Sequence, residues 1–268
     1  MLSQRTIKNK ITCSGVGLHT GKKVKLTFHP AEPNTGILFR RIDGDKVVDI
    51  PATAKNVGET TLSTTLVYGD YKISTIEHLL SALAGTGVDN CIIDCDGPEI
   101  PIMDGSSTQF VFLIQTAGIV EQNAVKKFVY VTKSVQVQRD DAVARIKPYD
   151  GFRVTFTLEF DHPVYNKYPH SASIDFSQTS FIREVSRART FGLMDDLEKL
   201  KKMNLALGAN LNNAIGIGDE DVLNEGGLRF ADEFVKHKIL DAIGDLYLLG
   251  HNLICLLYTS PSPRDPRE

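Results

Sequence analysis

The sequence predicts an α+β protein whose two halves repeat one order of elements. In the first third, apolar and polar residues alternate, as in Val24, Leu26 and Phe28, which is typical of strands with one buried face. From Ser74 onward the apolar residues instead follow the i, i+3, i+4, i+7 spacing of a helix. Strand alternation followed by helical spacing recurs after about residue 125, so we expect a similar order in both halves.

The first half is expected to run from hairpins to a helix, a strand and a second helix. Glycines and prolines separate the short alternating segments, which predicts hairpins. A helix that begins near Ile76 should end at Gly85 or Gly87, and a strand should follow at residues 88–95. The second helix should end at Gly118, because glycine commonly follows the last helical residue.

The second half returns to strands before a long final helix. Alternation at residues 128–137 and 154–160 predicts strands, and apolar spacing at residues 231–249 predicts the helix. We therefore assign residues 1–124 to a first domain and residues 125–254 to a second.

The end of the chain has a different composition. Pro261, Pro263 and Pro266 cannot continue a helix or pair as part of a central strand. We therefore expect residues 255–268 to be a disordered tail of non-native sequence.

Composition excludes several classes of function. Lys and Arg number 30 against 33 Asp and Glu, a net charge of −3, so no strong field favours nucleic acid or an anionic membrane. No apolar run reaches the roughly 20 residues that span a bilayer, and the first residues lack the apolar core of a secretory signal. We expect a cytoplasmic protein with reduced thiols and no stable membrane insertion, and we take it to be a monomer.

Two of the expected helices present a second face of small and ionisable residues. In the earlier helix this face carries His78 and Gly85, opposite the apolar stripe. In the later helix it carries His237, Asp241 and Gly244. Small residues let two backbones approach closely, so contact between the faces would bring His78 near His237 and Asp241.

These residue types favour a metal site. His237 and Asp241 are one helical turn apart, which directs both side chains to one point, although the pair alone also fits a solvated polar face. His78 would supply a third ligand. Two imidazoles and one carboxylate leave one position open on tetrahedral Zn²⁺, which is the arrangement of catalytic zinc sites.

Two further carboxylates each have two interpretations. Glu77 precedes His78 and fits a base that takes a proton from water. Residues 74–77 also fit a capping box, in which Glu77 only bonds back to the cap residue at the start of the helix. Asp245 lies one turn beyond Asp241 and fits either a group that orients a ligand or an exposed acid.

Residues 186–191 contain further candidate groups. Thr190 offers a hydroxyl to an oxyanion, while Arg187 and Arg189 fit either phosphate contacts or surface charges. His19 lies in a glycine-rich turn that lacks the Gly-Lys-Ser/Thr ending of a phosphate loop, so no role is assigned to it.

Six ordered segments resemble the UDP-3-O-acyl-N-acetylglucosamine deacetylases, the bacterial zinc-dependent amidases that commit substrate to lipid A synthesis. The likeness runs from about residue 3 to Ile254. Six motifs in order are much more specific than any one of them. The segments are residues 14–21, 74–79, 99–106, 186–192, 223–225 and 237–245.

The resemblance implies a more detailed fold and a ligand set. It implies two similar domains, each a β-sheet with two helices, stacked so that the helices are the inner layers of a β-α-α-β sandwich. It further implies that His78, His237 and Asp241 bind Zn²⁺ and that Glu77 is the general base.

It also implies the reaction: water attacks the N-acetyl group of UDP-3-O-(3-hydroxyacyl)-N-acetylglucosamine, giving acetate and UDP-3-O-(3-hydroxyacyl)-glucosamine. Thr190 would help to hold the oxyanion, and Asp245 would support protonation of the amine. Lys238 resembles a phosphate contact and Phe160 an aromatic that stacks on uracil. The residues that resemble an acyl-chain passage are Phe191, Met194, Leu197 and Ala206.

The resemblance breaks at Cys255. The family's Ser-Gly-His motif, whose histidine works with the aspartate at the position of Asp245, is absent. We therefore expect a C-terminally truncated chain that is less active and less stable than a complete family member. Two alternatives stay open: another zinc hydrolase, such as a peptidase or a different sugar amidase, and a non-catalytic protein that binds a nucleotide sugar or a lipid.

Overall fold

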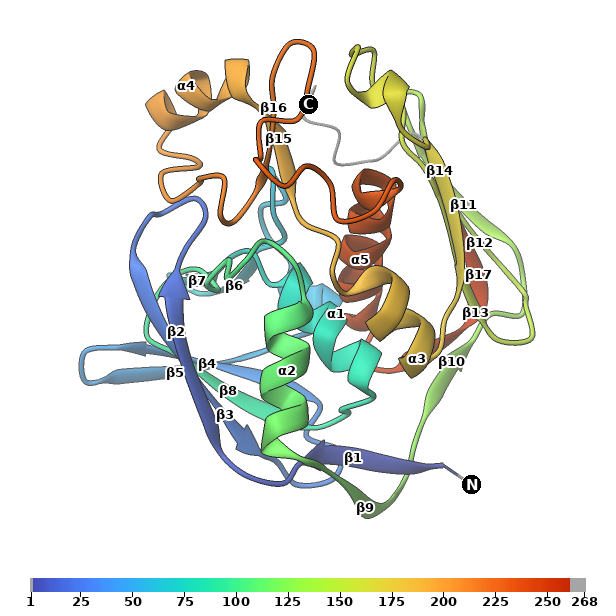
Figure 1. Ribbon diagram of the computed structural model, residues 1–268. Helices are drawn as coiled ribbons and strands as arrows, with labels where there is room; N and C mark the ends of the chain where they lie inside the picture. The colour runs from blue at the N-terminus through green and yellow to red at the C-terminus, as the bar shows by residue number, and fades with distance from the viewer. Residues whose placement is uncertain (1, 261–268) are drawn as a thin grey trace.

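A five-stranded sheet forms one side of the molecule (Figure 1). The computed structural model describes residues 2–260, so the expected tail at 261–268 lies outside the described residues. The predicted alternation is confirmed, because Val24, Leu26 and Phe28 are all buried. All neighbours in this sheet are antiparallel except β4 and β8, which are parallel. In spatial order the strands are β2 (Ile11–Val16), β3 (Lys23–Pro30), β8 (Cys91–Cys95), β4 (Ile37–Asp43) and β5 (Lys46–Pro51).

A six-stranded sheet forms the opposite side (Figure 1). Its order is β11 (Val135–Arg139), β12 (Ala142–Lys147), β17 (Asn252–Ser260), β13 (Phe152–Thr157) and β14 (Ser171–Asp175), and β10 (Phe128–Tyr130) also pairs with β17.

Strand β17 corrects the prediction for the end of the chain. It pairs with β12 on one side and β13 on the other, so the expected disorder from Cys255 is wrong for residues 255–260. Its buried residues alternate: Leu253, Cys255, Leu257 and Thr259. The three prolines that suggested disorder all follow Ser260, so they do not interrupt the ladder.

Three two-stranded ribbons complete the strands. They are β1 (Ser3–Ile7) with β9 (Ile119–Val125), β6 (Leu66–Tyr68) with β7 (Tyr71–Ile73), and β15 (Phe191–Leu193) with β16 (Ile215–Ile217).

Helices α1, α2 and α5 lie between the two large sheets in Figure 1. The α+β class is thus confirmed, and the two expected helices near residues 76–85 and 231–249 exist with slightly shorter bounds. The helices are α1 (Glu77–Thr86), α2 (Thr108–Ala117), α3 (Gln178–Ser180), α4 (Met194–Lys202) and α5 (Glu233–Tyr247). Short helical turns are η1 (Ala54–Asn56), η2 (Tyr165–Lys167) and the π-helical η3 (Phe181–Val185), which continues α3.

The small-residue faces of α1 and α5 meet, as predicted. A β-carbon placed on Gly244 would lie 2.1 Å from the backbone oxygen of Glu77, so the two backbones touch there and only glycine fits without movement. Gly85 plays a different part from the one expected. Its missing side chain makes room for the ring of Phe181 in η3, whose Cδ1 would lie 2.1 Å from an added β-carbon.

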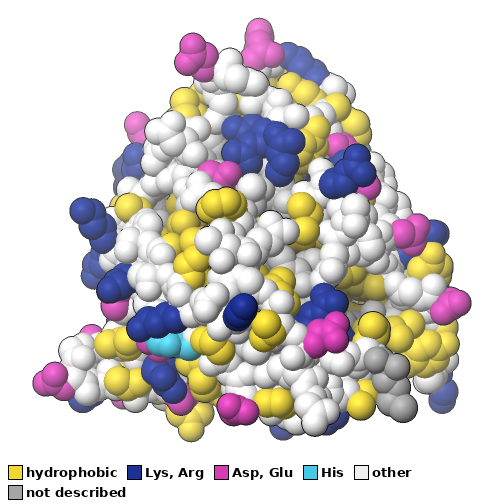
Figure 2. Space-filling view, turned by 60° about the horizontal axis from the view of Figure 1, so that its bottom comes forward, with side chains coloured by type: hydrophobic (Ala, Val, Ile, Leu, Met, Phe, Trp, Pro, Cys, Tyr) yellow, Lys and Arg dark blue, Asp and Glu magenta, His cyan; other side chains and the backbone are white. Residues whose placement is uncertain are grey.

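The outer surface carries charges of both signs. On the face shown in Figure 2, basic, acidic and hydrophobic side chains are interspersed, in line with the small net charge. Across residues 2–260, none of the helices has both the length and the apolar character needed to cross a membrane. The four cysteines are free thiols, and burial raises the pKa of Cys91 to about 12 and that of Cys255 to about 11.

Candidate active site

Helices α1 and α5 bring the three predicted metal ligands together. His78 lies at the start of α1, and His237 and Asp241 face it from α5. One ligand atom from each of the three residues lies within 4.8 Å of the others. The Asp241 Oδ1 atom is 3.4 Å from His78 Nε2 and 3.5 Å from His237 Nε2, and the two imidazole rings meet edge to face. All three residues are buried, which removes the solvated polar pair as an explanation.

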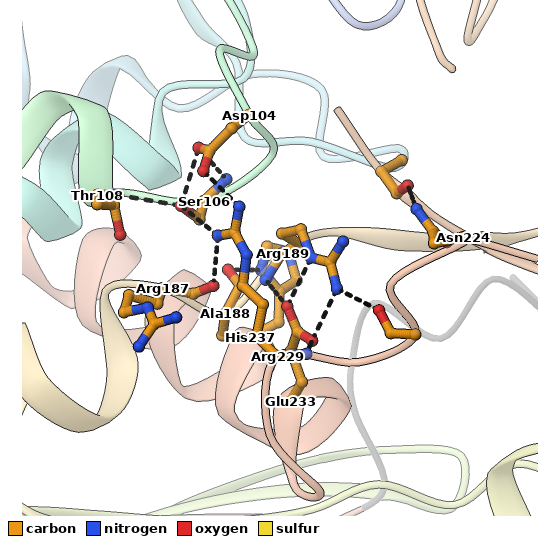
Figure 3. A network of polar contacts seen from close by, with 12 residues as sticks. Asp104, Ser106, Thr108, Arg187, Ala188, Arg189, Asn224, Arg229, Glu233 and His237 are labelled. Atoms are coloured by element: carbon orange, nitrogen blue, oxygen red, sulfur yellow. Dashed lines mark hydrogen bonds and ion pairs between the residues drawn. The ribbon is translucent and has the colours of Figure 1, made fainter. Parts of the chain in front are cut away.

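The donor set fits a zinc ion. Within the described part of the chain, His78 Nδ1 and Asp241 Oδ1 have no hydrogen-bond partner, although both are buried. Buried polar atoms without partners are costly, and a cation would satisfy the carboxylate oxygen. His237 Nδ1 lies 3.1 Å from the carbonyl oxygen of Ala188, which can accept its proton and leave Nε2 free as a ligand atom (Figure 3).

The electrostatics suit metal binding at neutral pH. Complete burial lowers the pKa of His237 to about 3, so its imidazole is neutral, as a metal ligand requires. Burial by itself raises the pKa of Asp241, but the neighbouring His237 and Lys238 outweigh it and hold this pKa below its usual value. Asp241 is therefore the negative ligand of the set.

Glu77 and Asp245 are both connected to Thr64. The backbone N–H of Thr64 donates to Glu77 Oε2 at 3.1 Å, and its hydroxyl donates to Asp245 Oδ1 at 2.7 Å. The capping-box interpretation of Glu77 is wrong, because α1 has no side-chain cap and begins at Glu77 itself. Asp245 is half-buried and hydrogen-bonded, so the exposed interpretation of Asp245 is wrong as well.

A largely apolar cavity of about 190 Å³ opens beside these groups. The resemblance assigns a role to twelve residues, and ten of them line this cavity: Glu77, His78, Thr190, Phe191, Met194, Leu197, Ala206, His237, Lys238 and Asp241. Lys238 Nζ lies 5.4 Å from the centre of the Phe191 ring and 3.5 Å from Asp241 Oδ2.

Two predicted residues, Asp245 and Phe160, lie outside the cavity lining. Phe160 is buried and its ring stacks on Tyr165 with a centroid separation of 4.4 Å. The Phe160 and Phe191 rings meet edge to face. Arg189 does not offer a free charge to phosphate, since its guanidinium is paired with the buried Glu233. Arg187 is exposed.

Several residues of the site were missed in the sequence. Leu18, His19 and Leu62 line the cavity, and Thr64 links two carboxylates. His19 is held by Glu99, a fully buried carboxylate that accepts from the backbone N–H groups of His19 and Thr20 at 2.8 Å each. Burial lowers the pKa of His19, and the Glu99 charge opposes this effect only in part. The sequence offered one signal that His19 belongs to the site, namely its position inside the motif at residues 14–21.

The chain is similar to known deacetylases over almost its whole length. Residues 4–262 match the UDP-3-O-acyl N-acetylglycosamine deacetylase family (LpxC). The UDP-3-O-acyl-N-acetylglucosamine deacetylase of Methylococcus capsulatus is 61% identical over 254 residues, which are 95% of this chain and 84% of that protein. The protein of the same name from Alcanivorax borkumensis is 59% identical with the same coverage.

These matches bear on the predicted break at Cys255. The family match continues beyond Cys255 to residue 262, so it does not support the break, and the lower activity inferred from the break has no support either. The match over residues 4–262, together with the buried His78, His237 and Asp241 group, places the chain in the UDP-3-O-acyl-N-acetylglucosamine deacetylase family.

Proposed function

We propose that this chain is a zinc-dependent hydrolase that removes the N-acetyl group from UDP-3-O-(3-hydroxyacyl)-N-acetylglucosamine in lipid A synthesis. The observation that carries the proposal is the convergence of two histidines and an aspartate, His78, His237 and Asp241, at an apolar cavity in a member of this family. Zinc held by these three residues would act as a Lewis acid toward the acetamide carbonyl and would favour ionisation of water at neutral pH.

Glu77 is the proposed general base. Its carboxylate lines the cavity next to His78 and is oriented by the backbone N–H of Thr64. A carboxylate fixed in this way can take the proton from the attacking water at one oxygen while the other keeps its hydrogen bond. Asp245, held by the Thr64 hydroxyl, supports the later protonation of the amine.

Thr190 is the proposed donor to the oxyanion. Its backbone is fixed from both sides, since its N–H donates to the Gly105 carbonyl at 2.7 Å and its carbonyl accepts from Ile215 at 2.8 Å. A donor whose position is set before the reaction stabilises developing charge without reorganisation.

The cavity is the proposed site of the acyl chain. Phe191, Met194, Leu197 and Ala206 supply apolar surface, which suits an alkyl chain. Lys238 at the cavity wall is the proposed phosphate contact. Phe160 is proposed as the uracil contact, and because it is stacked on Tyr165, this role requires the two rings to separate or the base to bind at the ring edge.

The proposal includes a domain arrangement. Residues 1–124 form one domain with the five-stranded sheet, α1 and α2. Residues 125–254, extended to Ser260 by the rest of β17, form a similar one with the six-stranded sheet and α5, the helices being the inner layers. The arrangement of the sheets and helices in Figure 1 supports it. All residues with a proposed role come from one chain, so we propose that the monomer is active, which sedimentation under assay conditions checks.

Acetate release tests the function. The zinc-loaded chain should release acetate from the acylated UDP-sugar and act poorly on UDP-N-acetylglucosamine, which lacks the chain that fills the cavity. Glu77→Gln should lower kcat by about 10²–10⁴-fold with unchanged zinc content, because it removes only the base. Preferential cleavage of peptides, or tight binding of the UDP-sugar without acetate release, would overturn the proposal in favour of another hydrolase or a binding protein.

A further inference from the structure

We propose that the buried ion pair between Arg189 and Glu233 is a positioning device for the active site. It sets the place of two neighbouring groups, the Ala188 carbonyl and Thr190. This inference rests on the proposed function, because both groups belong to the same site. It also gives a role to two sequence motifs, residues 99–106 and 186–192, that the metal ligands do not explain.

The segment that carries these groups has no regular structure of its own. Residues 186–190 form a turn and then an irregular stretch between η3 and β15. Within it, the Ala188 carbonyl lies 3.1 Å from His237 Nδ1, and Thr190 reaches the cavity two residues later. Backbone hydrogen bonds join Thr190 to Gly105 and Ile215, but no strand ladder joins residues 186–189 to α5. The position of this segment relative to α5 therefore depends on side-chain anchors.

Arg189 provides the strongest anchor (Figure 3). Its Nε and Nη2 atoms donate to the two carboxylate oxygens of Glu233 at 2.8 and 3.1 Å, and its backbone N–H donates to Glu233 Oε1 at 3.1 Å. A further bond joins Nη2 to the Gly227 carbonyl at 2.9 Å. Glu233 is completely buried and the Arg189 side chain is only 11% exposed, so the two-point contact is shielded from water.

Glu233 connects the segment to the helix that supplies two metal ligands. It lies in the first turn of α5, four residues before His237. The same helix therefore carries the Glu233 carboxylate, which accepts from the backbone N–H of Arg189, and the His237 imidazole, which contacts the Ala188 carbonyl. The distance between Thr190 and the ligands on α5 is then fixed by the Arg189–Glu233 contact.

Arg229 adds a second anchor, which reaches Asp104 in the first half of the chain. Its backbone N–H donates to Glu233 Oε2 at 2.6 Å, and its guanidinium donates to the Arg187 carbonyl at 2.8 Å and to Asp104 Oδ2 at 2.9 Å (Figure 3). Since Thr190 also donates to Gly105, the 99–106 motif holds the segment from the other side. The two motifs are thus joined by the Arg229 side chain and by the hydrogen bond from Thr190 to Gly105.

Arg189→Lys is the direct test, because it keeps the positive charge and removes the planar guanidinium that donates to both carboxylate oxygens. We expect kcat to fall by about 10–100-fold with little change in KM, and the visible spectrum of the Co²⁺-substituted protein to shift as His237 loses its fixed partner. Arg153→Lys is the matched control, since Arg153 also makes a two-point contact, with Asp175 at 2.7 Å for both bonds, but on the exposed face of the six-stranded sheet. It should leave both the kinetics and the spectrum unchanged.

A double variant tests the same inference in case Arg189→Lys does not fold. Arg189→Met combined with Glu233→Gln leaves no unpaired buried charge and should fold, yet it should show the same fall in kcat and the same spectral shift. The inference is overturned if either variant, folded by circular dichroism, keeps kcat within about twofold of wild type and an unchanged Co²⁺ spectrum. If wild type itself releases no acetate, the proposed function fails, whereas the spectrum still tests the positioning of His237.

Discussion

Gly244→Ala inserts one methyl group at the closest contact between α1 and α5. The new β-carbon would lie 2.1 Å from the carbonyl oxygen of Glu77 and 2.9 Å from its carbonyl carbon. Both atoms belong to the backbone of the residue next to His78, so no side chain can rotate away. The helices must instead move apart, and the movement occurs at the proposed base.

The size of the effect follows from these distances. Restoring an ordinary contact of 3.4 Å from 2.1 Å requires a displacement of about 1.3 Å. Overpacking costs about 1–3 kcal/mol, and alanine returns about 1 kcal/mol of helix propensity, so the net loss of stability is about 0–2 kcal/mol. A misplacement of about 1 Å at reacting groups costs about 100-fold in rate. Activity should therefore fall much more than stability.

The assay compares acetate release with urea unfolding for the same protein preparation. Gly226→Ala is the control, because an added β-carbon there meets no atom within 4 Å and Gly226 lies in an exposed loop. Equal kcat for Gly244→Ala and wild type would refute the close contact of the two helices at Glu77. Complete unfolding of Gly244→Ala would refute the predicted balance of packing and propensity.

Three further changes probe the surroundings of the site. Gly85→Ala should destabilise the fold by about 1–3 kcal/mol by striking the Phe181 ring, and Phe181→Leu in the same chain should restore part of that loss in urea unfolding. Thr64→Val should lower kcat roughly tenfold by removing the donor to Asp245, whereas Thr64→Ser should keep the rate; equal rates for all three proteins would contradict this role. Burial raises the pKa of Asp104, but hydrogen bonds from Arg229 and Ser106 outweigh burial and hold the pKa below 3.8. The unfolded chain therefore takes up this proton first, so the stability that Asp104 adds over Asp104→Asn should be complete above about pH 4 and should disappear as the pH falls through the folded pKa. A constant difference between pH 7 and pH 2 would contradict that sign.

The helix faces were the most predictable part of the molecule. Apolar spacing placed one stripe of each helix in a core, and the small residues opposite indicated a second close contact, which exists at Gly244. Histidine and aspartate on those faces then predicted a metal site, and the three side chains do converge. Their convergence was predictable because helical periodicity fixes side-chain direction from local sequence alone.

Contacts between distant segments were not predictable in the same way. Periodicity shows that Gly85 faces away from the core stripe, but only the tertiary structure shows that it meets Phe181 rather than α5. The guanidinium of Arg189 is a group that often binds phosphate. Its pairing with Glu233, 44 residues later, depends on how an irregular segment lies against α5, which local sequence does not show. The link from Thr64 to Asp245 spans 181 residues and has no local signal.

The end of the chain shows how composition can hide a pattern. Residues 253–259 alternate between buried and half-buried positions, as a strand requires. The prolines and charges after Ser260 made residues 255–268 look uniform, so a six-residue strand segment was grouped with them. The alternation within the shorter window was the better guide.

Zinc binding by the folded protein tests the central claim most directly. Wild type and His170→Ala, whose altered histidine is exposed and far from the proposed ligands in sequence, should each bind about one zinc ion per chain at neutral pH. His78→Ala, His237→Ala and Asp241→Ala should each bind zinc far more weakly while keeping the wild-type circular dichroism spectrum. Equal zinc affinity in wild type and these three variants would contradict the assignment of the site.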